Sequence, residues 1–330
     1  MLSGIPLSGR GTHPGRALLG VLALAACKAP PPPTAAADTA PRAWEWTQDT
    51  IDSIVDDARA GPSLKPATWP GGARVAVLFS FDVDNETVNL RFGQPTIGEL
   101  SQGQYGARQG LRRVVELMDR NEIPASFFIP AVSLRLAPEM ADLIKRSGRH
   151  EFAVHGWIHE MNSALPAAVE KDLVARAMAE LERLTGYRPV GYRAPSWNFS
   201  AATLAILREL GFLYDSSLMA DDDPYEITAD GQPTGIVELP VEWILDEAPL
   251  VNPRGNAYST PRDLAHVWID EFDKAREEGG MFILTTHPHL IGHRSRIVAL
   301  ELLIEHIRSQ PDVWFATHRA AAEYVRTGGG

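Results

Sequence analysis

Two histidines spaced four residues apart give this chain its clearest chemical signal. His155 and His159 lie in the segment EFAVHGWIHE, just after a short apolar run. On one helical turn, residues i and i+4 point the same way, so both imidazoles would reach one metal ion. Paired histidines also occur by chance, and the alternatives are a satisfied core histidine at 155 and a solvated loop residue at 159. The pair gains weight because other polar clusters also end strand-like runs.

Two carboxylates end one of these runs. Asp82 and Asp84 follow the segment VAVLFSF. A carboxylate at the end of an apolar strand is costly to bury unless it is paired or bound to metal. The alternative is a pair of solvated acids on a loop. One aspartate together with the two histidines would make a three-ligand set, which leaves positions open for water and substrate as catalytic zinc sites do.

An arginine ends another strand-like run. Arg193 lies in the segment GYRAPSWNFS, where it would hold a carboxylate in a bidentate pair and lower the pKa of that carboxylate. A purely structural ion pair would look the same in sequence. Trp197, in the same segment, is either a sugar-facing wall or a residue of the core.

A further histidine follows the run MFILTT. His287 is a candidate general acid that would protonate a leaving amine, and His289 is the rival for that role. Asp246, in the segment VEWILDEAP, would orient and charge His287. This assignment competes with two neighbouring acids, Glu242 and Glu247.

Strand-like and helix-like segments alternate along the chain, and this order predicts a parallel sheet in an α/β fold. Strands are expected over residues 74–82, 125–130, 152–155, 190–193, 212–214, 236–240, 281–286 and 313–316. Helices are expected over residues 44–60, 111–121, 138–147, 166–185, 200–210, 261–278, 295–309 and 319–326. The count suits a closed or nearly closed barrel formed by a single domain. In such a barrel, polar groups at the carboxyl ends of several strands build the active site.

The first 27 residues have the pattern of an export signal. Arg10 and Arg16 precede an apolar run over residues 17–26 that is too short to span a bilayer. The run ends in Leu-Ala-Ala-Cys, which resembles the lipobox of bacterial lipoproteins, with Cys27 as the lipid-modified residue. The alternative is an ordinary cleaved signal with a stray cysteine. Cys27 is the only cysteine of the chain, so an internal disulfide is excluded.

The remaining chain divides by composition into three parts. Residues 28–43 are rich in Pro, Ala and Thr and are expected to form an extended tether. Residues 44–68 are expected to form a helical segment that packs on the barrel. Residues 69–330 would then form the catalytic domain.

The charge and the motif content exclude several functions. The net charge is −11, and removal of residues 1–26 leaves 42 acidic against 29 basic residues, or −13. This argues against nucleic acid as a partner and against an electrostatic hold on anionic lipid, so the lipid on Cys27 would be the only membrane link. A Gly-x-Ser-x-Gly elbow and a glycine-rich phosphate loop are both missing from the sequence, which argues against a serine nucleophile and against a phosphate-binding loop.

The clusters FDVDNE, HGWIH, RAPSW, VEWILD and TTHPH, in this order, resemble the polysaccharide deacetylases of carbohydrate esterase family 4, the NodB-homology domain. The resemblance runs from about Trp69 to Tyr324. The usual first motif of the family has two adjacent aspartates, whereas Asp82 and Asp84 flank a valine here. That departure, with YGARQG and LYDSSLMADDDPY, resembles a branch that holds peptidoglycan deacetylases and metal-independent allantoinases.

The resemblance implies a distorted (β/α)7 barrel and a set of roles. By this resemblance the site would comprise a base with its partner (Asp82, Arg193), metal ligands (Asp84, His155, His159) and an acid (His287). Asp246 is the expected support of that acid, and Tyr105 and Trp197 are the expected substrate-binding aromatics. The implied cofactor is a divalent metal, Zn²⁺ first, with Co²⁺, Ni²⁺, Fe²⁺ and Mn²⁺ as alternatives.

The expected reaction is removal of N-acetyl groups from amino sugars of peptidoglycan or another envelope glycan. The enzyme would be exported and lipid-anchored to a bacterial membrane, facing the periplasm or the cell exterior. Hydrolysis of a small cyclic amide and a catalytically inactive glycan-binding lipoprotein are the two alternatives. The sequence leaves homo-oligomerisation open.

Overall fold

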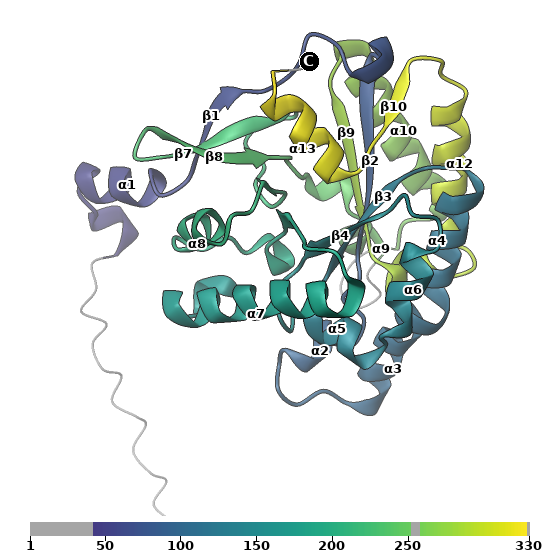
Figure 1. Cartoon of the computed structure of the whole chain (residues 1–330), viewed down its shortest axis with the longest axis horizontal. Helices are drawn as coiled ribbons and strands as arrows, with labels where there is room; N and C mark the ends of the chain where they lie inside the picture. The colour runs from purple at the N-terminus through teal and green to yellow at the C-terminus, as the bar shows by residue number, and fades with distance from the viewer. Residues whose placement is uncertain (1–41, 252–257, 329–330) are drawn as a thin grey trace, which may run out of the picture. The chain divides into compact units, whose positions relative to one another are not determined.

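The computed structural model describes residues 42–251 and 258–328 (Figure 1). The predicted lipidation site, Cys27, and nearly all of the predicted tether lie outside these residues. The elements from Thr47 onward belong to one compact unit. Among the described helices, none is long and apolar enough to cross a membrane.

The unit is built on a ten-stranded sheet whose central strands are parallel. In spatial order these are β9 (Met281–Thr286), β2 (Val75–Asp82), β3 (Ala125–Ile129), β4 (Glu151–Val154), β5 (Gly191–Tyr192), β6 (Tyr214–Asp215) and β8 (Gln232–Glu238). The short β10 (Val313–Phe315) pairs with the first half of β2. A bridge between Asp246 and Thr285 joins the chain after β8 to β9, so the sheet curls toward closure.

Helices follow most of the strands and neighbour one another along the sheet. The longer ones are α3 (Ile97–Tyr105), α4 (Leu111–Arg120), α6 (Glu139–Lys145), α7 (Ala167–Thr185), α8 (Thr203–Leu210), α10 (Pro261–Glu278), α12 (Ile297–Arg308) and α13 (His318–Arg326). Shorter ones are α2 (Thr87–Leu90), α5 (Ala131–Leu136), α9 (Ala248–Val251) and α11 (Pro288–Ile291), and a π-helical turn (Gly106–Gly110) joins α3 to α4. The alternation of strand and helix is the one that the sequence predicts.

Strand β2 explains how the two faces of the sheet are used. Every residue of this strand is buried, as expected of a parallel strand covered on both faces. Side chains alternate between faces, and those of Val77 and Phe79 join the core formed with the helices, whereas Ala76 and Leu78 join a second core that includes α13 residues. Asp82, at the end of the strand, belongs to the second face.

The structure differs from the sequence prediction at the hairpin and at the N-terminal segment. The helix expected over residues 44–60 is shortened to α1 (Gln48–Val55), and β1 (Arg59–Ser63) follows it. Strand β1 pairs antiparallel with β7 (Tyr225–Ala229), which forms a hairpin with β8. The sequence predicts neither β1 nor β7. The composition of β1 has little strand propensity, so this strand gains its conformation from pairing with β7.

The hairpin turn itself carried a sequence signal. Asp230 and Gly231 connect β7 to β8, and both have positive φ angles, 50° and 68°. Asp-Gly is a typical pair for a two-residue hairpin turn. Because of this hairpin, β8 begins at Gln232, four residues before the expected strand start at 236.

Candidate active site and metal centre

The two carboxylates at the end of β2 are buried at the centre of the site. Asp82 ends the strand and Asp84 follows two residues later, and each is only 2% exposed. Burial of two carboxylates this close is unfavourable unless cations or hydrogen-bond donors compensate. The structure supplies different compensating partners to each of them.

The histidine pair lies on a loop, so the expected helical turn is wrong. Strand β4 ends at Val154, and the next residues are irregular. Gly156 and His159 take positive φ angles, 74° and 63°, which fold the loop back on itself. The Glu160 carboxylate accepts hydrogen bonds from two backbone N–H groups of the loop, with N···O distances of 2.7–3.0 Å. A tight loop closed by Glu160, and not a helical turn, therefore brings the two imidazoles of the i, i+4 pair together.

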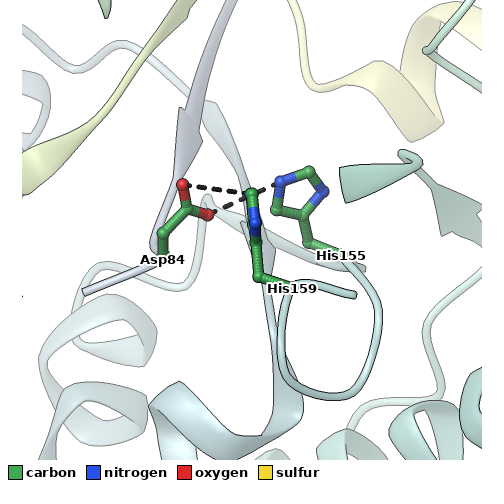
Figure 2. A group of neighbouring side chains, drawn as sticks. All are labelled: Asp84, His155 and His159. Carbon is green, nitrogen blue, oxygen red and sulfur yellow. Dashed lines mark ion pairs between the residues drawn. The ribbon is translucent and has the colours of Figure 1, made fainter. Parts of the chain in front are cut away.

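Asp84, His155 and His159 converge on one point (Figure 2). The carboxylate oxygens of Asp84 lie 3.5 Å from His155 Nε2 and 3.4 Å from His159 Nε2. One ligand atom from each residue lies within 4.8 Å of the other two. Asp84 Oδ1 is buried and makes no hydrogen bond in the described structure. An orphaned oxygen on a carboxylate that approaches two imidazoles, one with each oxygen, fits a divalent metal with three protein ligands, as in catalytic zinc sites.

His159 is uncharged in this cluster, and the two histidines have different outer partners. Burial, the neighbouring His155 and Arg91 lower the pKa of His159 well below its usual value, so the imidazole is neutral as a metal ligand must be. His155 Nδ1 lies 2.8 Å from the carbonyl oxygen of Arg193. A hydrogen bond donated there places a ring hydrogen on Nδ1, the arrangement in which Nε2 is the atom that binds a metal.

Asp82 is held by an arginine, as the sequence predicts. Arg193 Nη1 lies 2.7 Å from Asp82 Oδ1, and both side chains are almost completely buried. Burial by itself would raise the pKa of Asp82, but Arg193 and then His155 outweigh it and lower that pKa. Asp82 is therefore an ionised carboxylate, with Oδ2 3.5 Å from His155 Nε2.

Every nitrogen of the Arg193 guanidinium donates a hydrogen bond. Arg193 donates from Nε to the Ser216 carbonyl at 2.9 Å, from Nη2 to Ser216 Oγ at 2.9 Å and from Nη1 to Ser80 Oγ at 3.0 Å. Its guanidinium lies 3.9 Å from the centre of the Phe128 ring. His318 Nε2 lies 3.4 Å from Nη2. These contacts fix the orientation of the arginine, and with it the position of Asp82.

His287 faces the same cluster from the end of β9. Its Nε2 lies 3.7 Å from Asp84 Oδ2, and its Nδ1 lies 2.9 Å from Glu247 Oε2. The predicted partner, Asp246, is farther away, with Oδ1 3.6 Å from Nδ1. Burial by itself would lower the pKa of His287, but Glu247 and Asp246 outweigh it and raise that pKa well above its usual value. His287 is therefore a cation that can give up a proton.

His289, the other candidate for the general acid, has a lowered pKa where that of His287 is raised. Burial and the neighbouring His287 lower the pKa of His289 to about 3. Its Nδ1 is buried and has no hydrogen-bond partner in the described structure. His289 is therefore neutral, which makes it a poorer general acid than His287.

The two aromatic residues predicted to bind substrate lie in different surroundings. Trp197 is half-buried and contacts Trp243, with ring centroids 4.3 Å apart, and Trp243 is 50% exposed. Tyr105 stacks on His293 at 3.9 Å and donates its hydroxyl to the Gly292 carbonyl. The contacts of Tyr105 tie it to the chain after α11 and do not reach the ligand cluster, so its binding role stays a prediction.

Comparison with known proteins decides the family. The polysaccharide deacetylase family model matches residues 103–214. A peptidoglycan deacetylase of Helicobacter pylori is 30% identical over 284 residues, which cover 76% of this chain and 97% of the relative. The chain belongs to the polysaccharide deacetylase family.

Solved structures agree with this deacetylase assignment. The structure of a polysaccharide deacetylase family protein from Mycobacterium smegmatis has a TM-score of 0.75 at 36% identity, covering 82% of this chain and 96% of that one. The allantoinase Puue has a TM-score of 0.72 at 25% identity, covering 82% of this chain and 95% of that one. The predicted α/β barrel-type fold is confirmed, and so is a hydrolase acting on carbon–nitrogen bonds.

Several residues of this deacetylase site escaped the sequence analysis. Glu247 was only a competitor of Asp246, although it makes the shorter contact with His287. Glu160 closes the histidine loop, and its position one residue after His159 was the available signal. Arg91 contacts His159 from 68 residues away along the chain, and no sequence pattern pointed to it.

Proposed function

We propose that this protein is an exported, metal-dependent deacetylase that hydrolyses N-acetyl groups of amino sugars in peptidoglycan or another envelope polysaccharide. One observation carries the proposal: the Asp84 carboxylate lies within 3.7 Å of His155, His159 and His287. The ligand set and the acid thus meet at one buried point, and the base, Asp82, lies beside them with Oδ2 3.5 Å from His155 Nε2. Hydrolysis of an unactivated amide needs all three of these groups.

The ligand set would hold a divalent metal, Zn²⁺ first, through Asp84, His155 and His159. Such a metal supplies Lewis acidity toward the amide carbonyl and lowers the pKa of water. The three residues leave coordination positions open for water and substrate. Family membership and the orphaned Asp84 oxygen support this assignment.

Asp82 would accept the proton of the attacking water. Arg193 keeps this carboxylate ionised, and its Oδ1 is already occupied by the arginine at 2.7 Å. Oδ2 is the oxygen on the side of the ligand set, 3.5 Å from His155 Nε2. The proton would therefore pass to Oδ2.

His287 would protonate the departing nitrogen. The nitrogen of an amide leaves poorly unless it is protonated. An amide therefore needs a positioned acid, whereas an activated ester does not. His287 meets this need because Glu247 holds Nδ1 and leaves the Nε2–H directed toward the cluster. Once that proton is donated, the products are a free amine and acetate.

Three observations support an envelope glycan as the substrate. The Helicobacter pylori relative is named a peptidoglycan deacetylase. The exposed Trp243 and the half-buried Trp197 that contacts it offer flat apolar surface to a sugar ring. The signal-like residues 1–27 and Cys27 would place the enzyme outside the cytoplasm as a lipid-anchored protein. The net charge of −11 argues against nucleic acid.

The similarity to an allantoinase favours one second candidate, hydrolysis of a small cyclic amide. The intact set of Asp84, His155 and His159 argues for the metal-dependent reaction over this alternative. Acetate release from N-acetylglucosamine oligomers and peptidoglycan, run beside ring opening of allantoin and a cyclic imide, separates the two. Acetate release without ring opening supports the proposal. Ring opening without acetate release overturns it in favour of the second candidate.

A further inference from the structure

Arg91 makes an unusual contact with one of the candidate metal ligands. This arginine directly follows α2, and its Nη1 lies 2.9 Å from His159 Nδ1 and 2.8 Å from Ser196 Oγ. The same nitrogen lies 3.5 Å from the His159 carbonyl oxygen and 3.6 Å from Met161 Sδ. A permanent cation is thus placed against the outer edge of a ligand set that would hold another cation.

The direction of this hydrogen bond restricts the imidazole. An arginine has only donors, so His159 Nδ1 must accept. A neutral imidazole carries one ring hydrogen, which then belongs to Nε2, the atom 3.4 Å from Asp84 Oδ2. Nε2 can bind a metal only through its lone pair. In the arrangement described, His159 therefore cannot act as a ligand through Nε2.

The other histidine shows the opposite arrangement. His155 Nδ1 lies 2.8 Å from a backbone carbonyl, that of Arg193, which has no hydrogen to donate. Nδ1 of His155 therefore carries a hydrogen, which is the arrangement in which Nε2 binds a metal. The outer partners of the two histidines thus fix Nδ1 as a donor in His155 and as an acceptor in His159.

We propose that Arg91 is a positioning residue that opposes metal binding at His159 and lowers the metal affinity of the whole site. The inference rests on the metal site of the proposed function. For Nε2 to become a ligand, Nδ1 must carry the hydrogen, and the Arg91 guanidinium must release it. Ser196 Oγ and the His159 carbonyl oxygen remain as acceptors for the released arginine. The positive charge of Arg91 adds a repulsion toward the incoming dication.

The test is the dissociation constant of Zn²⁺ for metal-free protein, measured by competition with a chromophoric chelator. Arg91→Met removes the donor and the charge but keeps an unbranched side chain, and it should bind Zn²⁺ about tenfold more tightly or better, the scale of outer-partner effects on metal sites. Arg91→Lys retains the cation and should stay near wild type. An unchanged or weaker affinity in Arg91→Met overturns the proposal, as does an equal gain in Arg91→Lys.

Ser196→Ala is the matched control. It removes the second acceptor of Arg91 without touching the contact with His159. Arg91 would then be left to His159, so the affinity for Zn²⁺ should not rise. A gain equal to that of Arg91→Met would show that the Ser196 turn, and not the arginine, limits metal binding, and would overturn the proposal.

A measurement on unmodified protein keeps the proposal testable if the variants fold poorly. Long-range ¹⁵N–¹H NMR spectra of histidine-labelled, metal-free protein report which ring nitrogen carries the hydrogen. We expect His159 to carry its ring hydrogen on Nε2 and His155 to carry one on Nδ1. An Nδ1–H tautomer at His159 would overturn the proposal. Both measurements are independent of any substrate, so a failed deacetylase assay would leave their result intact.

Discussion

Glu247 grips His287 at two points. Its Oε2 lies 2.9 Å from His287 Nδ1, and its Oε1 accepts the His287 backbone N–H at 2.5 Å. Asp246, the preceding residue, approaches Nδ1 only to 3.6 Å and accepts the Ala248 backbone N–H instead. A carboxylate that binds both the ring and the backbone fixes the imidazole in one orientation, with Nε2 directed at Asp84.

The first prediction separates the two carboxylates. Glu247→Gln should lower the turnover of an amide substrate at least about tenfold, because a neutral amide supports the cationic His287 poorly. Asp246→Asn should have the smaller effect. His287→Ala should show the full loss of turnover from removing the general acid, about 10²–10⁴-fold.

The measurement is kcat for the N-acetyl substrate and for an activated acetate ester in all three variants. The ester, whose leaving group needs no proton, should be affected much less. A larger loss in Asp246→Asn than in Glu247→Gln would assign the supporting role to Asp246. Equal losses for ester and amide in His287→Ala would remove the acid role from His287.

The second prediction concerns the glycine of the histidine loop. Gly156 has φ +74°, and a Cβ there would lie 2.8 Å from Pro195 Cγ and 3.0 Å from Glu160 Oε1. Gly156→Ala should displace the loop and weaken Zn²⁺ binding about tenfold or more. Gly148 has nearly the same φ, +71°, and open space around its would-be Cβ.

Gly148→Ala is thus a control for backbone strain alone. Both variants should lose about 1–2 kcal/mol of unfolding free energy from the left-handed conformation. Thermal unfolding measures that shared cost, and chelator competition measures the metal affinity. Similar metal affinities in the two variants would contradict the prediction that the loop geometry is set by the fit around Gly156.

The third prediction follows from a buried pair of carboxyl groups behind Arg193. Asp215 and Glu238 are fully buried and share the Ser217 backbone N–H as a donor. Burial, as the largest cause, raises the pKa of Asp215 to about 6 and that of Glu238 well above its usual value. Both groups thus bind protons more tightly in the folded than in the unfolded chain.

Raised carboxyl pKa values stabilise the fold below the unfolded pKa of about 4, and this stability is lost as the pH rises through about 6 and above. Glu238→Gln keeps an acceptor for Ser217 and removes one charge. Between pH 5 and pH 8 it should lose less stability than wild type, because only Asp215 is left to ionise in the variant. Denaturant unfolding at both pH values checks this, and parallel losses in the two proteins would contradict it.

The fourth prediction tests the lipid anchor. Cys27→Ser should move the protein from the membrane fraction to the soluble envelope fraction or the medium, because the several acyl chains of a bacterial lipoprotein anchor firmly. Cell fractionation and intact mass measure the outcome. A wild-type protein that is fully soluble and still carries residues 1–26 would contradict the lipobox interpretation.

Apolar runs made most of the fold predictable, because strands buried on both faces need them. Strand β9 was expected over its observed residues, and β2 begins one residue later than expected. The polar residues that end these strands were expected to meet, and Asp82, Asp84 and His287 do so. Strand β1 could not be predicted because its pairing partner lies more than 160 residues away along the chain.

Other parts of the site depend on backbone geometry and on packing. The i, i+4 histidines suggested a helix, but positive φ angles at Gly156 and His159 bring them together from a loop. Glu247 and Asp246 are adjacent in sequence, and only the three-dimensional path of the chain decides which one reaches His287. Such choices leave no periodic pattern that a sequence can reveal.

The most direct test of the central claim is the acetate released from peptidoglycan as metal-free protein is titrated with Zn²⁺. We predict that activity rises from near zero and saturates at one equivalent. Asp84→Asn should lose both the metal and the activity. Asp82→Asn should bind one equivalent yet release acetate about 10²–10⁴-fold more slowly, because its amide cannot accept the proton. Full activity in metal-free protein, or near-normal activity in Asp82→Asn, would contradict the account.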